Sequence, residues 1–192
     1  MFTGIITHLG KVVNKSENSL IIKTDKELIN SLSEGASVAV NGICLTVVSL
    51  TKNSFRIDFM PETAKKTNIK YLQTGSTVNL EPPATANSLL SGHIVQGHID
   101  GTAKLETIIQ EGNSYILKFA VSKGSSKYIV EKGSIAVNGI SLTVINIGKD
   151  FFTVGIIPNT WDKTMLHTVK LGDFFNIEVD ILAKYVEKLI KT

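Results

Sequence analysis

The octapeptide VNGICLTV at residues 40–47 appears again, with one change, as VNGISLTV at residues 137–144. In each copy apolar residues flank the dipeptide Asn-Gly, which favours a two-residue type I′ turn between antiparallel strands because both of its residues accept a positive φ. The two copies are 97 positions apart, and the same offset relates 37–81 to 134–178. Two copies are too few for a stacked solenoid, so the sequence predicts two similar domains.

The repeat also sets the predicted domain boundaries. Residues 2–12 resemble 95–105 more weakly, which extends the similarity to the start of each half. Between the halves, the stretch EPPATANSLLSG has two prolines and several small polar residues, as is typical of a linker. We therefore predict a first domain over 1–93, a second over 94–181, and a separate tail over 182–192.

Each half consists mainly of segments with the pattern of short strands. The segment SFRIDF (54–59) alternates apolar and charged residues, which predicts a half-buried strand, and TVNLE (77–81) and FNIEVD (175–180) are further strands. One short helix per half is predicted, at 25–35 and 125–133, because each segment ends at a glycine. Many short strands separated by turns indicate a small closed barrel in each half, so the predicted fold class is all-β.

The tail has a helical pattern instead. Its apolar residues recur at i, i+3, i+4, i+7 and i+8, which places them on one stripe of a helix. The stripe consists of Leu182, Tyr185, Val186, Leu189 and Ile190. No similar segment follows the first repeat, so we predict an oligomerisation helix that buries this stripe against other subunits.

Composition excludes several classes of function. The chain has 192 residues, a net charge of +3 and scattered lysines, and only 7% of its residues are aromatic, so a nucleic-acid-binding barrel is poorly supported. The sequence has no run of about 18 apolar residues, so it predicts no membrane span. The single cysteine excludes an internal disulfide, and the N-terminal residues lack the pattern of a signal peptide. These features predict a cytoplasmic protein that binds neither nucleic acid nor membrane.

The candidate polar residues lie within the repeated octapeptide and beside the linker. Cys44 and Thr46 share one strand face, as do Ser141 and Thr143, so each pair could form a pocket wall. The alternative is that the octapeptide is only a stable hairpin and Cys44 a small buried apolar residue. His98 follows a glycine and suits proton transfer, although its position taken alone favours a structural role.

Two further patterns contain candidate site residues, a pair of histidines and a repeated proline-threonine motif. His93 and His98 are five residues apart and would face opposite ways on a strand, and no cysteine or carboxylate cluster is near, so no metal site is predicted. In MPET and IPNT a proline ends a strand and Thr63 or Thr160 follows. Backbone groups freed by the proline could bind the edge of a flat heterocycle, or the threonine could simply cap a turn.

Taken together, MFTGI, GASVAVNGICLTV, MPET, SGHIVQGHIDG, VNGISLTV, IPNT and NIEVD resemble the riboflavin synthase family of the alpha-chain type over nearly the whole chain. The resemblance implies two six-stranded Greek-key barrels, each binding one 6,7-dimethyl-8-ribityllumazine. It implies a dismutation, the last step of riboflavin biosynthesis, in which a four-carbon unit passes between two lumazines to give riboflavin and 5-amino-6-ribitylaminouracil. It implies no cofactor, a homotrimer whose working site joins the first barrel of one subunit to the second barrel of its neighbour, and association with lumazine synthase.

The resemblance also implies a set of site residues. In the first barrel the implied ligand contacts are Gly4, Ile5, Ile6, Cys44, Leu45, Thr46, Asp58, Phe59, Met60, Pro61, Glu62 and Thr63. In the second barrel they are Gly97, His98, Ile99, Lys132, Ser141, Leu142, Thr143, Ile156, Ile157, Pro158, Asn159, Thr160 and Trp161. The implied catalytic residues are Cys44, His98, Ser141, Thr143, Ser37, Asp180 and Phe2. The chain departs from the family pattern at Ala64, Asn159 and Trp161.

A lumazine- or flavin-binding protein of the same fold without catalysis is the alternative. Such relatives keep one ligand site and lose the other. Here both halves keep the Asn-Gly hairpin, the polar strand face and the proline turn, which favours the enzyme.

Overall fold

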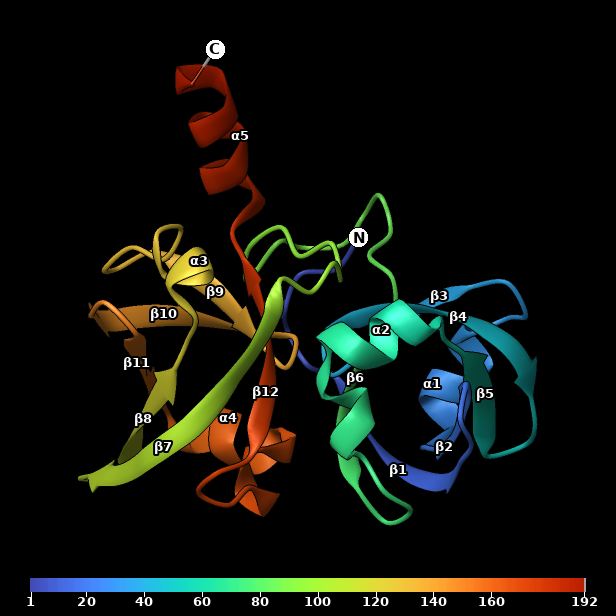
Figure 1. Ribbon diagram of the computed structural model, residues 1–192. Coiled ribbons are helices and arrows are strands. Elements are labelled where there is room, and N and C mark those ends of the chain that lie inside the picture. The colour runs from blue at the N-terminus through green and yellow to red at the C-terminus, as the bar shows by residue number, and fades with distance from the viewer. Residues whose placement is uncertain (192) are drawn as a thin grey trace.

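The repeated halves form two closed barrels of six antiparallel strands each in the computed structural model, which describes residues 1–191 (Figure 1). This confirms the predicted all-β fold with two Greek-key barrels and a C-terminal helix. The first barrel has the strand order β1-β2-β5-β4-β3-β6. Its elements are β1 (His8–Lys15), β2 (Ser19–Lys23), α1 (Lys26–Ser31), β3 (Ser37–Val40), β4 (Ile43–Leu50), β5 (Ser54–Asp58), α2 (Pro61–Lys66), the 3-10 helix η1 (Asn68–Tyr71) and β6 (Thr77–Glu81).

The second barrel repeats this arrangement with the strand order β10-β11-β8-β7-β12-β9. Its elements are β7 (Gly101–Glu111), β8 (Ser114–Ala120), α3 (Lys123–Ser126), β9 (Ser134–Val137), β10 (Ile140–Ile147), β11 (Phe151–Ile156), α4 (Pro158–Lys163), the 3-10 helix η2 (Met165–Thr168) and β12 (Phe174–Val179). The helix α5 (Ile181–Ile190) follows it and projects away from both barrels (Figure 1).

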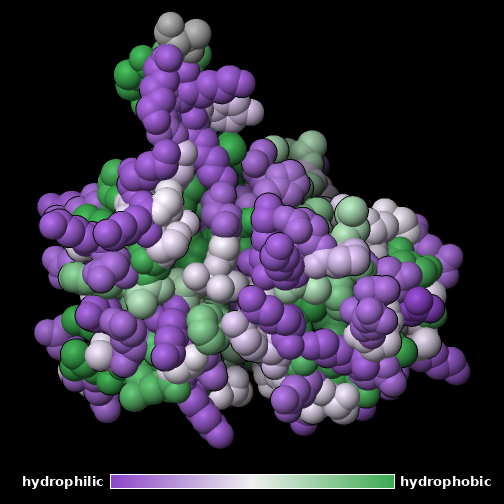
Figure 2. Space-filling model, viewed as in Figure 1, coloured by the Kyte–Doolittle hydropathy of each residue, from purple (hydrophilic) through white to green (hydrophobic). Residues whose placement is uncertain are grey.

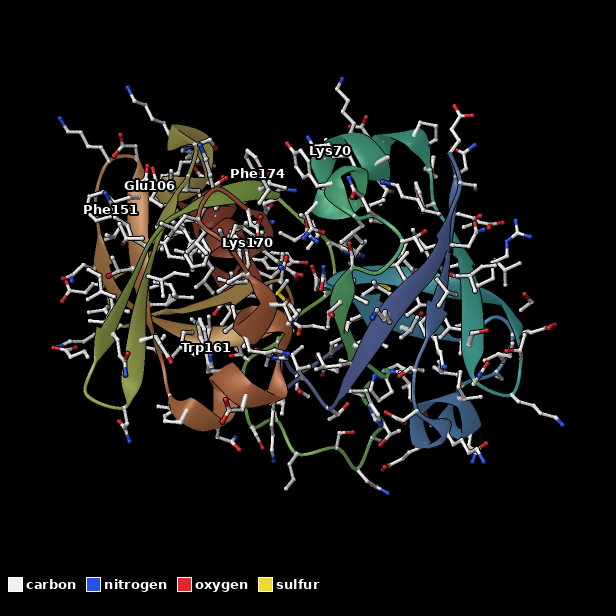
Figure 3. The ribbon with its side chains drawn as sticks, turned by 90° about the horizontal axis from the view of Figure 1, so that it is seen from below. Lys70, Glu106, Phe151, Trp161, Lys170 and Phe174 are labelled. Carbon is white, nitrogen blue, oxygen red and sulfur yellow. The ribbon has the colours of Figure 1, made fainter. Side chains whose placement is uncertain are left out.

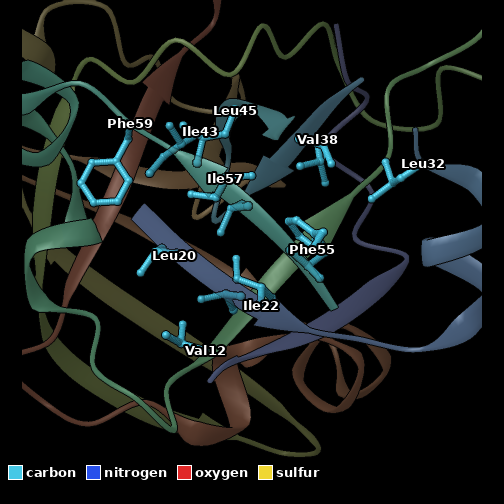
Figure 4. Close-up of a cluster of buried hydrophobic side chains, with 14 of the residues drawn as sticks. Val12, Leu20, Ile22, Leu32, Val38, Ile43, Leu45, Phe55, Ile57 and Phe59 are labelled. Atoms are coloured by element: carbon cyan, nitrogen blue, oxygen red, sulfur yellow. The ribbon is translucent and has the colours of Figure 1, made fainter. Parts of the chain in front are cut away.

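Each barrel has its own apolar core. In β5, Phe55 and Ile57 are buried while Arg56 and Asp58 are exposed, which confirms the alternation predicted for this strand. Figure 4 shows both apolar side chains among those that fill the first barrel. The second barrel buries a separate cluster, so each barrel has a packed core of its own.

The repeated octapeptides form the predicted hairpins. Asn41 and Gly42 have φ angles of 46° and 78°, and the equivalent residues in the second copy have 47° and 78°. The two turns also meet each other where the barrels join. A Cβ atom added to Gly139 would lie 2.8 Å from the backbone nitrogen of Gly42, so glycine is required here for close approach as well as for backbone conformation.

We predict that Gly139→Ala is more destabilising than Gly75→Ala. Both glycines have positive φ, but a Cβ atom on Gly75 would meet nothing within 4 Å. Gly75→Ala is expected to cost about 1–2 kcal/mol of unfolding free energy from backbone conformation alone. Gly139→Ala adds an overpacking cost of about 1–3 kcal/mol at the junction of the barrels. Urea unfolding of both variants measures the difference, and equal losses would contradict the packing argument.

Four fully buried asparagines tie the barrels together. The side-chain amide of Asn79 in β6 donates to the carbonyl oxygen of Asn138 at 3.0 Å, and that of Asn176 in β12 donates to the carbonyl oxygen of Asn41 at 2.9 Å. Each barrel thus donates a hydrogen bond to the Asn-Gly turn of the other barrel. Nearby, the rings of Tyr71 and Phe174 stack with centroids 4.6 Å apart across the junction. Figure 3 shows Phe174 on the side of the second barrel that faces the first.

The helices differ in part from the prediction. The helix predicted at 125–133 is only the short α3, which ends at Ser126, because the segment contains poor helix formers and Lys132 has a positive φ of 63°. Pro61 and Pro158 do not merely end strands, since each begins a six-residue helix. Proline suits the first position of a helix because its missing N–H would have no partner there. Thr63 therefore lies inside α2 and is not a cap.

The C-terminal helix begins one residue before the predicted tail, and Thr192 lies outside the described residues. Lys184 pairs with Asp100 at 2.5 Å, and Glu187 accepts hydrogen bonds from Lys127 at 2.8 Å and from the Tyr128 hydroxyl. These donors, with Lys191, lower the pKa of Glu187 to about 2.

The apolar stripe of α5 stays open to solvent, with Leu189 77% exposed, and the helix stands clear of the rest of the surface (Figure 2). We find no helix among residues 1–191 with the length and apolar character that a membrane span needs.

Candidate active site

Two segments leave their own barrels and lie against the other one. We call residues 2–7 the N-terminal crossing segment and residues 93–99 the central crossing segment. The carbonyl oxygen of Gly4 accepts a hydrogen bond from the backbone N–H of Ser141 at 2.7 Å, and that of Gly97 accepts one from the N–H of Cys44 at 3.0 Å. Phe2 and Val95 form an antiparallel bridge where the segments meet.

The crossing corrects the predicted grouping of contacts. The sequence placed Gly4–Ile6 with the first barrel and Gly97–Ile99 with the second, but the structure places each group on the opposite barrel. Ile6 packs against the core of the second barrel and Ile99 against the core of the first. The sequence repeat could not reveal this exchange. The two crossing segments are equivalent in the repeat, so each barrel has an equivalent segment beside it whether or not the two are exchanged.

The first half-site, defined by Cys44, Thr63 and residues 97–99, surrounds a cavity of about 210 Å³. The structure therefore brings together Cys44, His98 and Thr63, three residues that the sequence singled out. Cys44 is half-buried and borders this cavity, so it is not a sealed core residue. The remaining lining residues are Ile43, Glu62, Lys66 and Thr67.

The predicted run Asp58–Thr63 borders two hollows. Glu62 and Thr63 line the cavity of the first half-site, whereas Asp58–Pro61 line a neighbouring cleft of about 470 Å³ together with Asn18 and Arg56. The residues of this run therefore line two different hollows, and the change from one to the other falls between Pro61 and Glu62 at the start of α2.

The second half-site is defined by Ser141, His93 and Gly4. The hydroxyl oxygen of Ser141 and Nδ1 of His93 lie 2.7 Å apart, within hydrogen-bonding distance. Burial lowers the pKa of His93, against the opposing charge of Asp180, so its ring is neutral at neutral pH. Its Nε2 is buried and has no hydrogen-bond partner within residues 1–191. A neutral imidazole can exchange a proton with the hydroxyl, in a direction set by its tautomer.

Sequence reasoning missed His93 as a functional residue. It was considered only as a metal ligand on a strand with His98, but both histidines lie in the central crossing segment outside regular strands. His93 reaches the second half-site while His98 borders the first. Among residues 1–191 no group of three or more histidine, cysteine, aspartate or glutamate side chains could hold a metal ion.

The two half-sites differ at one wall. Trp161 on α4 stacks on Tyr115 with ring centroids 4.0 Å apart, and Figure 3 shows Trp161 at the second barrel. The equivalent positions of the first repeat are Ala64 and Asn18. The second barrel thus has a stacked aromatic pair where the first barrel has two smaller side chains.

Other predicted residues fall into three groups. Leu45, Leu142, Ile156 and Phe59 are buried in the barrel cores, and Phe2 is fully buried between the barrels. Ser37 pairs with Thr46 across β3 and β4, and Thr46 and Thr143 face outward. The third group lies around these strands. Its exposed members are Ile5, Met60, Lys132, Ile157 and Asn159, whereas Pro158 and Thr160 are half-buried in α4. Asp180 caps α5 by accepting a hydrogen bond from the N–H of Leu182.

Two barrels that each present a polar strand face, a crossing segment and a proline-initiated helix define a tandem-barrel ligand-binding protein. The family model described as the lumazine binding domain matches residues 3–82 and 96–180. A riboflavin synthase of Actinobacillus pleuropneumoniae is 41% identical over 99% of this chain and 90% of its own length. One of Bacillus subtilis is 40% identical over the same shares. The solved structure of LumP complexed with riboflavin matches with a TM-score of 0.87 at 27% identity, covering 93% of this chain and 99% of that one. The chain belongs to the riboflavin synthase family and is an enzyme of this type.

Proposed function

We propose that the chain converts two molecules of 6,7-dimethyl-8-ribityllumazine into riboflavin and 5-amino-6-ribitylaminouracil by moving a four-carbon unit from one to the other. The observation that carries this proposal is the presence of two half-sites with the same construction. A reaction between two copies of one substrate needs two similar sites, and here both repeats retain one.

The differences between the half-sites suit unequal roles. The first half-site has a thiol and His98, whereas the second has the hydroxyl of Ser141 beside His93. One lumazine must give up carbon atoms and the other must accept them, so proton transfers differ between the two. A neutral histidine with a hydroxyl partner is suited to such transfers at neutral pH.

The proposed working form is a cytoplasmic homotrimer. Its support is the exposed apolar stripe of α5, which a single chain leaves uncovered. In this form a first half-site faces the second half-site of the neighbouring subunit. Association with lumazine synthase stays a prediction from the family resemblance.

Binding of lumazine or flavin without turnover is the second candidate. It is favoured by the likeness to LumP, whose structure holds riboflavin. The two candidates differ in whether the second half-site takes part, since binding alone needs only one.

Incubation with 6,7-dimethyl-8-ribityllumazine as the sole substrate tests the proposal. We expect riboflavin fluorescence to appear, with one riboflavin formed for every two lumazines consumed. Binding that quenches lumazine fluorescence without any riboflavin would favour the second candidate. Boiled protein is the control for spontaneous conversion.

A further inference from the structure

The N-terminal crossing segment is held by a carboxylate of the first barrel. Oε1 of Glu81, at the end of β6, accepts hydrogen bonds from the backbone N–H of Thr3 at 2.7 Å and from its hydroxyl at 2.8 Å. Oε2 of Glu81 accepts from the N–H of Gly4 at 3.1 Å. The residue is only 4% exposed, so these bonds replace most of its contact with water.

The central crossing segment is held in the same way by the second barrel. Glu178, at the end of β12, accepts hydrogen bonds from the N–H of Gln96 at 2.7 Å and of Gly97 at 2.9 Å, one on each carboxylate oxygen. It is 3% exposed. Asp100 and Lys184 are the charged groups that act on it, with opposite signs.

Both carboxylates are costly to bury. Burial raises the pKa of Glu81 and of Glu178, and the N–H donors of the crossing segments oppose that rise. An ionised carboxylate can only accept hydrogen bonds, so it matches a row of backbone N–H groups, and such charge-assisted bonds are stronger than neutral ones. The donors of these hydrogen bonds belong to the crossing segments, which lie against the opposite barrel.

The held segments touch the chemically reactive positions. A Cβ atom on Gly97 would lie 2.5 Å from Cβ of Cys44, and one on Gly4 would lie 2.7 Å from Cβ of Ser141. The backbone is thus in direct contact with the side chain that differs between the half-sites. A small displacement of either segment must change the surroundings of that side chain.

We propose that Glu81 and Glu178 are positioning residues that act across the molecule: Glu81 of the first barrel orders the half-site at Ser141, and Glu178 of the second barrel orders the half-site at Cys44. Their effect on turnover rests on the proposed function, whereas their effect on the geometry of the half-sites does not.

The single cysteine gives a direct test. Cys44 serves as a natural thiol probe of the first half-site. A second protein, Cys44→Ser with Ser141→Cys, places the only thiol at the second half-site. Glu81→Gln and Glu178→Gln are then made in both proteins, and the rate of thiol modification by an aromatic disulfide is measured. Glutamine keeps the size of the side chain but puts an amide donor against a backbone N–H.

The expected pattern is crossed. Glu178→Gln raises the modification rate at Cys44 by about tenfold or more, the scale of one lost charge-assisted hydrogen bond, and leaves the thiol at position 141 within about twofold. Glu81→Gln does the reverse. Each carboxylate is the matched control of the other, because both are buried to the same degree in equivalent positions.

A purely structural role gives a different pattern. If each glutamine exposes the thiol on its own barrel, or both thiols equally, or neither, the proposal is overturned. Where a glutamine variant fails to fold, Thr3→Val is the milder replacement for Glu81→Gln, since it removes the hydroxyl donor to Glu81, which also accepts from the N–H of Ile5, and keeps the backbone donors. Glu178→Asp is the milder replacement at the other carboxylate, because it keeps the charge and withdraws it from the N–H groups of Gln96 and Gly97. A crossed thiol pattern, together with an unsubstituted chain that makes no riboflavin from lumazine, would refute the proposed function and leave the positioning roles intact.

Discussion

Replacing Ser141 with alanine is expected to lower the turnover of lumazine by about 10²–10⁴-fold, the usual range for loss of a positioned proton-transfer group. The substitution removes the hydroxyl that lies 2.7 Å from Nδ1 of His93. The unfolding free energy should fall by only about 1–3 kcal/mol, the cost of leaving one buried polar atom unpaired. Steady-state kinetics and urea unfolding separate the two effects.

The first half-site should respond in the same direction. Cys44→Ala and His98→Ala are also expected to reduce turnover, because both residues border the cavity of the first half-site. Ser114→Ala, in the β7–β8 hairpin, is the control, since its hydroxyl donates to the neighbouring Asn113 at the surface and lies outside both half-sites. Normal turnover in all three site variants would show that these residues are merely structural.

The sequence predicted those turns and strands whose conformation depends on residues close together in the chain. The two Asn-Gly turns and the alternation around Phe55 and Ile57 depend on nearest neighbours, and both were predicted correctly. The helices at Pro61 and Pro158 were missed because six residues are too few to show a helical period.

The arrangement of the site depends on long-range exchange, which a repeat conceals. Gly4 and Gly97 occupy equivalent positions, so the sequence pattern is the same whether each packs on its own barrel or on the other. His93 has no equivalent in the first repeat, and its partner is 48 residues away at Ser141. The repeated Glu81 and Glu178 were the one sequence signal for the exchange. They indicate it only when the backbone N–H groups that donate to them are known.

A chain that ends at Ile181 is expected to stay folded, to bind lumazine, and to lose turnover by about 10²-fold or more. Both barrels are complete without α5, whose contacts with the second barrel include ion pairs at the surface, such as Lys184 with Asp100, and a hydrogen bond from the Tyr128 hydroxyl to Glu187. Exposed ion pairs contribute about 0–1 kcal/mol each, so their removal leaves the barrels stable. A ten-residue helix is marginal in water, yet α5 exposes its whole apolar stripe, so in the proposed homotrimer the helix would gain stability from burial against other subunits.

The loss of turnover follows from the proposed assembly. If the two lumazines bind to half-sites of different subunits, a monomer binds each of them but cannot bring them together, and misplaced reactants cost about 10²-fold or more in rate. The truncated chain should sediment as a monomer with an unchanged thermal melt. Lys127→Ala is the matched control, because it breaks an ion pair with Glu187 of α5 and leaves the stripe intact, and it should sediment as a trimer with normal turnover. A truncated chain that remains trimeric, or a monomer with full activity, would show that α5 does not organise the site.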